Sequence, residues 1–413
     1  MLNSTLADKG IFRIKDWWQS KAALLMGMVY LFTAWFDIGF DQFLLLALLS
    51  VATISGFASF GYLLNDFFDR ESDALAGKKN FLAGKSQWSI LLLFLLALII
   101  LLLPWRWLPF TVFSAALIGA QILLFIIYSA PPLRLKEKGI SGIVIDALYA
   151  HALPVILAAY TYSLAAGKSL PALPIILLFA WQSFSGIRNI LLHQADDLQS
   201  DKKSGAKNFV AGIFPSPFYR YIRNSLLLEV AFSLTFFSVL LFSDRLFTIC
   251  FVTILIFALL IFIRFREKEL PVFLASKWKF FPNNVYEKWL PLSLLVAFCF
   301  IDKRFAVILL VHLVLFNANA ILQFFRFVYD VADVAYANIV KVAFHQVFVV
   351  FPDAVYQLLK RFYYFAKTWL KLITSSLINY PIYYVFLLFG VDLRKKNSSA
   401  LDYLKRNKKA KLN

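Results

Sequence analysis

The sequence predicts an all-α polytopic membrane protein. Of its 413 residues, 61% are apolar and only 16% are charged, and the mean hydropathy is +0.72. A soluble domain carries about 25% charged residues. The apolar runs are continuous, as in LLLFLLALIILLL at 91–103. Such runs favour spanning helices over the alternating strands of a membrane β-barrel.

Ten apolar segments are candidates for spanning helices. Asp302, Lys303 and Arg304 interrupt the last part of the pattern, so the chain there forms either one kinked helix or two helices joined by a tight turn. The segments lie near 22–36, 43–64, 88–104, 108–128, 143–160, 172–193, 225–243, 246–263, 289–300 and 305–322.

Basic residues are concentrated in alternate connections between these segments. Three to five Lys or Arg residues occur in each of the stretches 1–21, 65–88, 132–142 and 194–224. The intervening connections carry only Arg106, Lys168 and Arg245. This bias predicts an integral multi-pass protein of the cell inner or plasma membrane, with the basic loops in the cytoplasm. It also accounts for the net charge of +18 through anionic lipid, without a nucleic-acid partner.

A sixteen-residue pattern occurs twice, each time after a long apolar segment. Residues 69–84 read DRESDALAGKKNFLAG, and residues 197–212 read DLQSDKKSGAKNFVAG. Four spans separate the copies, so both are expected on the same side of the membrane. The shared residues are Asp69, Asp73, Gly77, Lys79, Asn80, Phe81, Ala83 and Gly84, matched by Asp197, Asp201, Gly205, Lys207, Asn208, Phe209, Ala211 and Gly212.

The acidic residues of each copy predict a metal site. If the helix of the second span continues to Asp73, then Asn65, Asp69 and Asp73 form one stripe. Like charges at this spacing repel, and carboxylates are unfavourable at a helix C-terminus, so the cluster requires a cation. Mg²⁺ fits, because it takes oxygen ligands from one or two carboxylates and from substrate phosphates. A solvated helix end is the alternative for a single motif, and the repetition argues against it. The candidate ligands are Asn65, Asp66, Asp69, Asp73, Asp197 and Asp201.

Basic side chains are expected near the same surface. Pro131 and Pro132 end the helix of the fourth span. Arg134 and Lys136 follow in the loop, where they are expected to lie near the mouth of the site formed by the acidic motifs. Arg188 lies inside the sixth span, about 2.5 turns before the second motif. An arginine in a span is a functional candidate by default, and the alternative is an ion pair with a buried acid such as Asp146.

Three motifs resemble those of the UbiA superfamily of intramembrane prenyltransferases. NDFFDRESD at 65–73 fits the pattern N-D-x-x-D-x-x-x-D, and DLQSDKKSG at 197–205 fits the second D-x-x-x-D motif with its trailing Gly. YSAPPLRLKEKG at 128–139 fits the Y-S-x-P-P-L-R-L-K loop. The resemblance covers residues 10–300.

The resemblance implies about nine transmembrane helices around a central cavity, with cytoplasmic Asp-rich loops. The implied activity is Mg²⁺-dependent transfer of a prenyl group from a prenyl diphosphate to an aromatic or other lipophilic acceptor. It implies catalytic roles for Asp69, Asp73, Asp197, Asp201 and Arg70, and diphosphate contacts for Lys79, Lys207, Tyr128 and Arg134. The basic residues Lys136 and Arg188 join the diphosphate-binding candidates.

Two other functions stay open. Some similar proteins transfer a phosphoribosyl group to a polyprenyl phosphate. A transporter that binds cations without catalysis is also compatible with the repeated half-structure.

The sequence predicts three regions. Residues 1–304 are the UbiA-like transmembrane domain, 305–392 are a further hydrophobic and amphipathic helical segment, and 393–413 are a basic cytoplasmic tail. Charges recur every few residues in 323–378, which favours helices lying at the membrane interface. The tail holds eight basic residues and is expected to rest on anionic lipid or to be disordered.

Overall fold

The computed structural model describes residues 11–75, 77, 80–204, 209–241, 246–264, 279–316, 361, 364 and 365; for 11, 15, 199–204, 216 and 260–264 it describes the backbone alone. The chain divides into two compact units, Met1–Asn317 and Ala318–Asn413. Apart from three single residues, the predicted interfacial segment at 323–378 and the basic tail at 393–413 lie outside the described residues.

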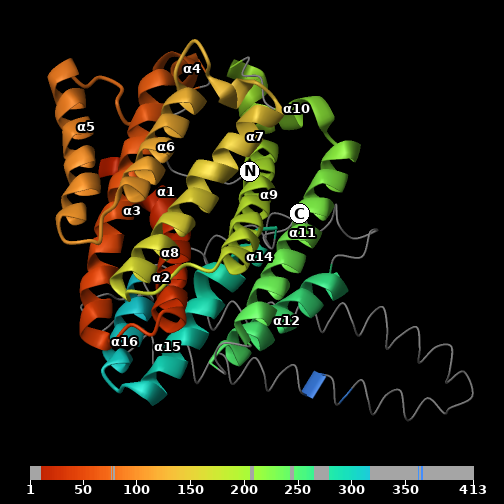
Figure 1. Ribbon diagram of the computed structural model, residues 1–413. Helices are drawn as coiled ribbons and strands as arrows, with labels where there is room; N and C mark the ends of the chain where they lie inside the picture. The colour runs from red at the N-terminus through yellow and green to blue at the C-terminus, as the bar shows by residue number, and fades with distance from the viewer. Residues whose placement is uncertain are drawn as a thin grey trace, which may run out of the picture. The chain divides into compact units, whose positions relative to one another are not determined.

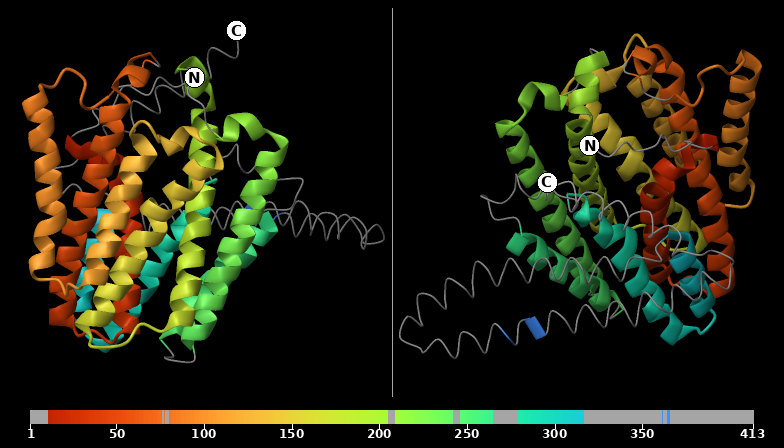
Figure 2. Two further views of the ribbon diagram at one scale, coloured as in Figure 1. Left: turned by 45° about the horizontal axis from the view of Figure 1, so that its top comes forward. Right: turned by 180° about the vertical axis from the view of Figure 1, so that it is seen from behind.

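The first unit is a bundle of helices, and its described residues contain no strand (Figures 1 and 2). The predicted all-α class is confirmed. The main helices are α2 (Ala23–Trp35), α3 (Phe40–Phe68), α5 (Gln87–Leu102), α6 (Val112–Ser129), α7 (Ile140–Ala147), α8 (Leu153–Ala165), α9 (Ala172–Ser204), α11 (Ser216–Leu241), α12 (Phe247–Arg264), α15 (Leu290–Ile301) and α16 (Phe305–Phe316). Shorter helices are α1 (Ile14–Trp17), α4 (Arg70–Leu75), α10 (Phe209–Ile213) and α14 (Phe281–Asn284).

Seven helical stretches among the described residues are long and apolar enough to cross a membrane. They are Phe40–Phe68, Gln87–Arg106, Val112–Ser129, Ile140–Ala165, Ala172–Leu198, Pro217–Leu241 and Phe281–Ile301. Two shorter apolar helices, Phe247–Leu259 and Phe305–Phe316, accompany them. The chain is therefore an integral membrane protein, and the count of about nine spans stays a prediction.

The charged interruption after residue 301 is a turn between two helices. α15 ends at Ile301 and α16 begins at Phe305. The backbone N–H of Arg304 donates to the Asp302 carboxylate at 2.9 Å, which closes the turn. α16 packs against α15 inside the first unit. Of the two arrangements that the sequence leaves open, the structure has two helices with a tight turn.

Close helix packing in the bundle depends on a small residue in α3. A Cβ atom added at Gly56 would lie 2.4 Å from backbone atoms of Leu101 in α5. Only the absence of a side chain lets these two backbones approach so closely, as is common between membrane helices. α5 and α6 turn many large apolar side chains outward, for example Leu92 at 63% exposure. Such side chains suit contact with lipid.

Within the described ranges, three π-helical turns interrupt the helices: η2 (Trp18–Ala22), η5 (Leu148–Ala152) and η6 (Val285–Trp289). Pro154 follows η5 and Pro291 follows η6, each at the start of the next helix. Because proline lacks an N–H, it cannot continue the regular hydrogen-bond ladder, and a wider turn satisfies the freed groups. Each π turn shifts the direction of the side chains that follow it.

The two repeated motifs lie at the same end of the bundle. α4 holds the end of the first acidic segment and α10 follows the second, and Figure 1 places both at the top of the unit. α4 also contacts α9, the helix that carries the second motif. Both copies thus lie at one end of the bundle, and their place on the cytoplasmic side of the membrane stays a prediction.

Candidate functional site

The first acidic segment spans the break between α3 and α4. α3 ends at Phe68, and Asp69 adopts φ −99° and ψ 4° before α4 begins. The Asp69 N–H still donates to the Asn65 carbonyl at 2.9 Å, and the Asp73 N–H to the Asp69 carbonyl at 2.7 Å. The helix expected to run unbroken to Asp73 is therefore kinked at Asp69, while the spacing of four residues is retained.

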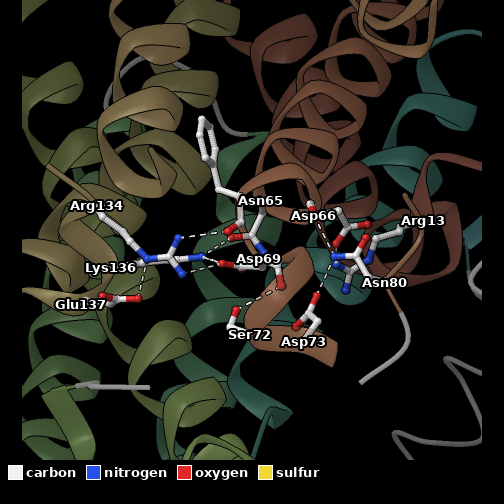
Figure 3. Close-up of polar contacts among 11 residues, drawn as sticks. Arg13, Asn65, Asp66, Asp69, Ser72, Asp73, Asn80, Arg134, Lys136 and Glu137 are labelled. Carbon is white, nitrogen blue, oxygen red and sulfur yellow. Dashed lines mark hydrogen bonds and ion pairs between the residues drawn. The ribbon is translucent and has the colours of Figure 1, made fainter. Parts of the chain in front are cut away.

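The Asp69 carboxylate is the most heavily contacted acid of the cluster (Figure 3). Arg134 donates from Nη2 to Oδ1 at 2.8 Å. Lys136 donates from Nζ to both carboxylate oxygens at 2.5 Å each, and to Asn65 Oδ1 at 2.9 Å. Charge-assisted hydrogen bonds of this kind are the strong ones. The loop after α6 therefore lies across the first motif and supplies two cations to one buried carboxylate.

The loop that presents these cations is strained at Arg134. Its φ of 37° lies in the left-handed region, which non-glycine residues adopt at an energetic cost. Such residues persist where their surroundings hold them, often at functional sites. Burial lowers the pKa of Lys136, and the Asp69 carboxylate opposes that shift. The charge pair thus supports the ammonium form of Lys136 inside the site.

Asp66 is compensated by an arginine that the sequence analysis did not select. Arg13 Nη1 lies 2.8 Å from Asp66 Oδ1, and the guanidinium stacks 4.7 Å from the centre of the Tyr62 ring. Phe12 and Arg13 both have positive φ values, 57° and 52°, where the chain bends toward the site. The only feature of the sequence that points to Arg13 is its place among the basic residues before the first span.

Asn80 explains part of the repeated loop. Its side-chain amide donates to the Asp66 carbonyl and to Asp73 Oδ2, both at 2.8 Å, and its Oδ1 accepts from the Leu82 N–H at 2.9 Å. The asparagine therefore ties the loop back to the acidic segment. Its repeat partner lies outside the described residues.

The second copy ties its loop to the helix in a related way. Gln194 Oε1 accepts from the Val210 N–H at 3.2 Å. These two residues match Asp66 and Leu82 of the first copy in sequence position. The loops differ locally, because Gly84 has φ 74° in a turn whereas the matching Gly212 lies within α10.

A cavity of about 340 Å³ opens between the two motifs. Asn65 and Asp197 both line it, so the two copies contribute to one space. Tyr128, another predicted site residue, lines it as well, and its ring contacts Tyr149 with centroids 5.2 Å apart. Apolar residues such as Phe57 form other parts of the wall. The cavity is therefore lined by both polar and apolar side chains.

Seven described residues of the predicted site do not line this cavity: Asp66, Asp69, Asp73, Arg134 and Lys136 of the cluster above, and Arg70 and Arg188. Arg70 is exposed, stacks 4.6 Å from the Phe67 ring centre and donates to the Phe67 carbonyl. Arg188 is buried against Glu229 of α11, with Nε–Oε2 at 2.6 Å and Nη2–Oε1 at 3.0 Å. Arg188 thus has the ion pair considered as its alternative, with Glu229 as partner instead of Asp146.

Three further predicted residues cannot be placed. Lys79, Lys207 and the Asp201 side chain lie outside what the structure describes. The backbone of α9 continues through Asp201, so Asp197 and Asp201 stand four residues apart on one helix. Asp196, beside them, forms an ion pair with Lys279.

Comparison with known proteins finds one family. The model of the UbiA prenyltransferase family matches residues 22–285, which is more than half of the chain. Similar solved structures include a UbiA homologue from Archaeoglobus fulgidus bound to GPP and Mg²⁺, with 18% identity, 67% of this chain and 95% of that chain covered, and a TM-score of 0.47. A structure of digeranylgeranylglyceryl phosphate synthase has 16% identity, covers 69% of this chain and 96% of that chain, and has a TM-score of 0.49. The apo structure of a UbiA homologue from Aeropyrum pernix K1 has 15% identity, covers 68% of this chain and 97% of that chain, and has a TM-score of 0.48. No curated protein matches the chain.

Proposed function

The chain belongs to the UbiA prenyltransferase family, and we propose that it transfers a prenyl group from a prenyl diphosphate to a lipophilic acceptor within the membrane. The observation that carries this proposal is the shared cavity, lined by Asn65 of the first motif and Asp197 of the second. A cavity lined by polar motif side chains and by apolar residues such as Phe57 suits a donor with a charged head and a hydrocarbon tail.

The proposed metal is Mg²⁺, and the residues present fit it. Among the side chains that the structure describes, no three His, Cys, Asp or Glu residues surround one metal position. Mg²⁺ does not require such a cage, since it typically uses one or two carboxylates, substrate phosphates and water. The cations now on Asp66 and Asp69 show the charge compensation that these acids need. The proposed ligands are Asn65, Asp66, Asp69, Asp73, Asp197 and Asp201.

When bound, Mg²⁺ would neutralise charge on the departing diphosphate. Arg134 and Lys136 are proposed to add positive charge at the same place, because both already contact the Asp69 carboxylate. Donors held in position before reaction stabilise developing charge at little reorganisation cost. The resemblance to the family adds Lys79, Lys207 and Arg70 to the proposed diphosphate contacts. Arg70 would have to turn away from Phe67 to make such a contact. Arg188 is left out of the proposed site, because Glu229 holds it.

The cavity wall is proposed to protect the reactive prenyl carbon. Tyr62, Tyr128 and Phe125 present rings to the cavity. The π faces of aromatic rings attract cations. A site with little water lets an allylic cation meet the acceptor before water captures it. The catalytic domain is proposed to be residues 1–304, with the motif loops in the cytoplasm, as the distribution of basic residues supports.

The test uses the purified full-length protein with a set of prenyl diphosphates, Mg²⁺ and a membrane-lipid extract. Diphosphate release is followed with and without EDTA, and mass spectrometry identifies the alkylated lipid. Metal-dependent release is expected with at least one donor. No release with any donor, but label uptake from phosphoribosyl diphosphate, would instead select phosphoribosyl transfer. Ion flux in liposomes without catalysis would select the transporter; membership of a prenyltransferase family favours neither alternative.

A further inference from the structure

A second polar group lines the same cavity as Asn65 and Asp197. Lys21, Gln121, Asp146 and Tyr149 all line the cavity. Lys21 belongs to the π turn η2, and Tyr149 belongs to η5. π turns inside helices occur frequently at functional sites, because they redirect side chains at one point. Two such turns thus contribute side chains to one cavity wall.

These polar side chains are held in defined positions. The Tyr149 hydroxyl donates to Asp146 Oδ1 at 2.5 Å, and Lys21 Nζ donates to His151 Nε2 at 2.9 Å. Gln121 donates from Nε2 to the Tyr149 carbonyl at 3.0 Å, which sets the orientation of its amide. One of the two amide protons is therefore committed to the backbone of η5.

Gln121 leaves an acceptor to be satisfied. The side chain is 1% exposed, and its Oε1 has no hydrogen-bond partner among the described residues. A buried carbonyl without a donor is unfavourable, and native proteins rarely keep one without a reason. Because Gln121 lines the cavity, a ligand group carrying an O–H could supply the missing donor.

The charges of this group select the kind of ligand. Lys21 offers N–H donors, whereas Asp146 and Gln121 Oε1 offer acceptors. The ammonium and the carboxylate cancel in net charge, so the group does not attract an anion strongly. A carboxylate or phosphate placed here would face Asp146 and be repelled. A hydroxyl both donates and accepts, and it matches the set without adding charge.

We propose that Lys21, Gln121, Asp146 and Tyr149 form the acceptor subsite, and that the acceptor is an uncharged lipid with a hydroxyl group. This inference rests on the proposed function and names its second substrate. The hydroxyl oxygen forms a bond to C1 of the prenyl group while the bond from C1 to the diphosphate oxygen breaks. That electron pair leaves with the diphosphate, and the hydroxyl proton passes to the Asp146 carboxylate. The products are a prenyl ether, diphosphate and protonated Asp146, which returns its proton to solvent.

The experiment compares three probes of equal chain length: 1-decanol, decyl methyl ether and decanoate. Each is given to the purified full-length protein with Mg²⁺ and the prenyl diphosphate that shows the strongest release. Mass spectrometry measures the alkylated product. Separately, a donor labelled with ¹⁸O at the bridging position reports reversible C1–O cleavage without any acceptor. Capture of 1-decanol as an ether is expected, with no product from the methyl ether and little from decanoate.

Variants separate the acceptor subsite from the donor site. Asp146→Asn should lower ether formation by about 100-fold or more, the usual contribution of a positioned base. Isotope exchange should stay within about twofold, because this variant leaves the donor site intact. Asp146→Glu should restore part of the activity. Gln121→Leu should raise KM for 1-decanol about tenfold with little change in kcat. The control Asp302→Asn, in the turn between α15 and α16, should change neither readout.

The outcomes distinguish the two proposals. Isotope exchange without capture of 1-decanol would overturn the acceptor subsite and leave prenyl transfer standing. So would conversion of decanoate as fast as 1-decanol, or wild-type ether formation by Asp146→Asn. Absence of both exchange and diphosphate release with every donor would overturn prenyl transfer itself. Because exchange reports a folded donor site, an inactive Asp146→Asn protein that still exchanges supports the proposal.

Discussion

Lys136 Nζ contacts both carboxylate oxygens of Asp69 at 2.5 Å, across 67 residues of sequence. The contact joins the loop after α6 to the first acidic motif. It leaves the carboxylate with a protein cation at the position where a metal ion is proposed to bind. Metal binding must then displace or share this ammonium, and the displaced charge becomes available to the diphosphate.

Replacing Lys136 should therefore change metal binding and turnover in opposite directions. Lys136→Met removes a positive charge beside the proposed ligand, so Mn²⁺, used as a spectroscopic substitute, should bind about tenfold more tightly. Turnover should fall by about 10- to 100-fold, because the diphosphate loses a cation. Electron paramagnetic resonance measures the metal affinity. Lys138→Met, an exposed lysine of the same loop, is the matched control and should change neither quantity. Weaker metal binding by Lys136→Met would contradict the displacement.

The two motifs should both be required for diphosphate release. Asp69→Asn and Asp197→Asn should each lower Mg²⁺-dependent release by about 1,000-fold, since each removes a proposed oxygen ligand. Release is measured with the preferred donor, and gel filtration in detergent checks the fold. Asp196→Asn changes the exposed neighbour of Asp197, which pairs with Lys279, and should retain near wild-type release. Full activity in both motif variants would rule out the metal assignment.

Asn80 should contribute to stability through the loop it closes. Asn80→Leu removes the hydrogen bonds to the Asp66 carbonyl, Asp73 and the Leu82 N–H. Leaving these buried partners unsatisfied should lower the free energy of unfolding by about 1–3 kcal/mol. Thermal unfolding in detergent measures the loss. Ser72→Ala, which removes a single bond to the Asp69 carbonyl, should cost less. Equal melting temperatures for Asn80→Leu and wild type would show that the loop is held by other contacts.

Arg188 should act on stability and not on donor binding. Arg188→Met strands the buried Glu229 carboxylate, which should cost about 3–5 kcal/mol. The double variant Arg188→Met/Glu229→Leu removes both charges and should recover most of that loss. Denaturant titration of the purified protein measures the unfolding free energies. If Arg188→Met unfolds like wild type but raises KM for the prenyl diphosphate, then Arg188 contacts the donor.

Local patterns accounted for the helices and for the acidic residues. The continuous apolar runs predicted helical spans. Backbone N–H and C=O groups in lipid must be hydrogen-bonded within the protein, and a helix pairs them within one segment. The repeated motif predicted two equivalent helix ends, which lie at one end of the bundle. The proline pair predicted the end of α6 and the display of Arg134 and Lys136 near the acidic motifs. Each of these inferences uses residues that are close together in the chain.

The contacts of Arg13 and Arg188 could not be obtained in the same way. Arg13 reaches Asp66 across 53 residues, and Arg188 reaches Glu229 across 41. Sequence reasoning counted Arg13 only among the basic residues expected in the cytoplasm before the first span, and it gave Arg188 a possible partner in the wrong helix. The partner of a charge in a span depends on which helix faces it. That choice is made by packing, as at Gly56 and Leu101, where a missing side chain sets the distance between helices.

The sequence by itself determined the class of the protein, the approximate positions of its main apolar helices and the residue types of its acidic motifs. The tertiary structure alone decided that Asn65 and Asp197 line one cavity, that Lys136 holds Asp69, and that Lys21 and Tyr149 line the wall of the same cavity. The physical reason is the distance along the chain over which each effect acts. Hydropathy and helical spacing act over a few residues, whereas cavities and ion pairs arise where distant helices meet.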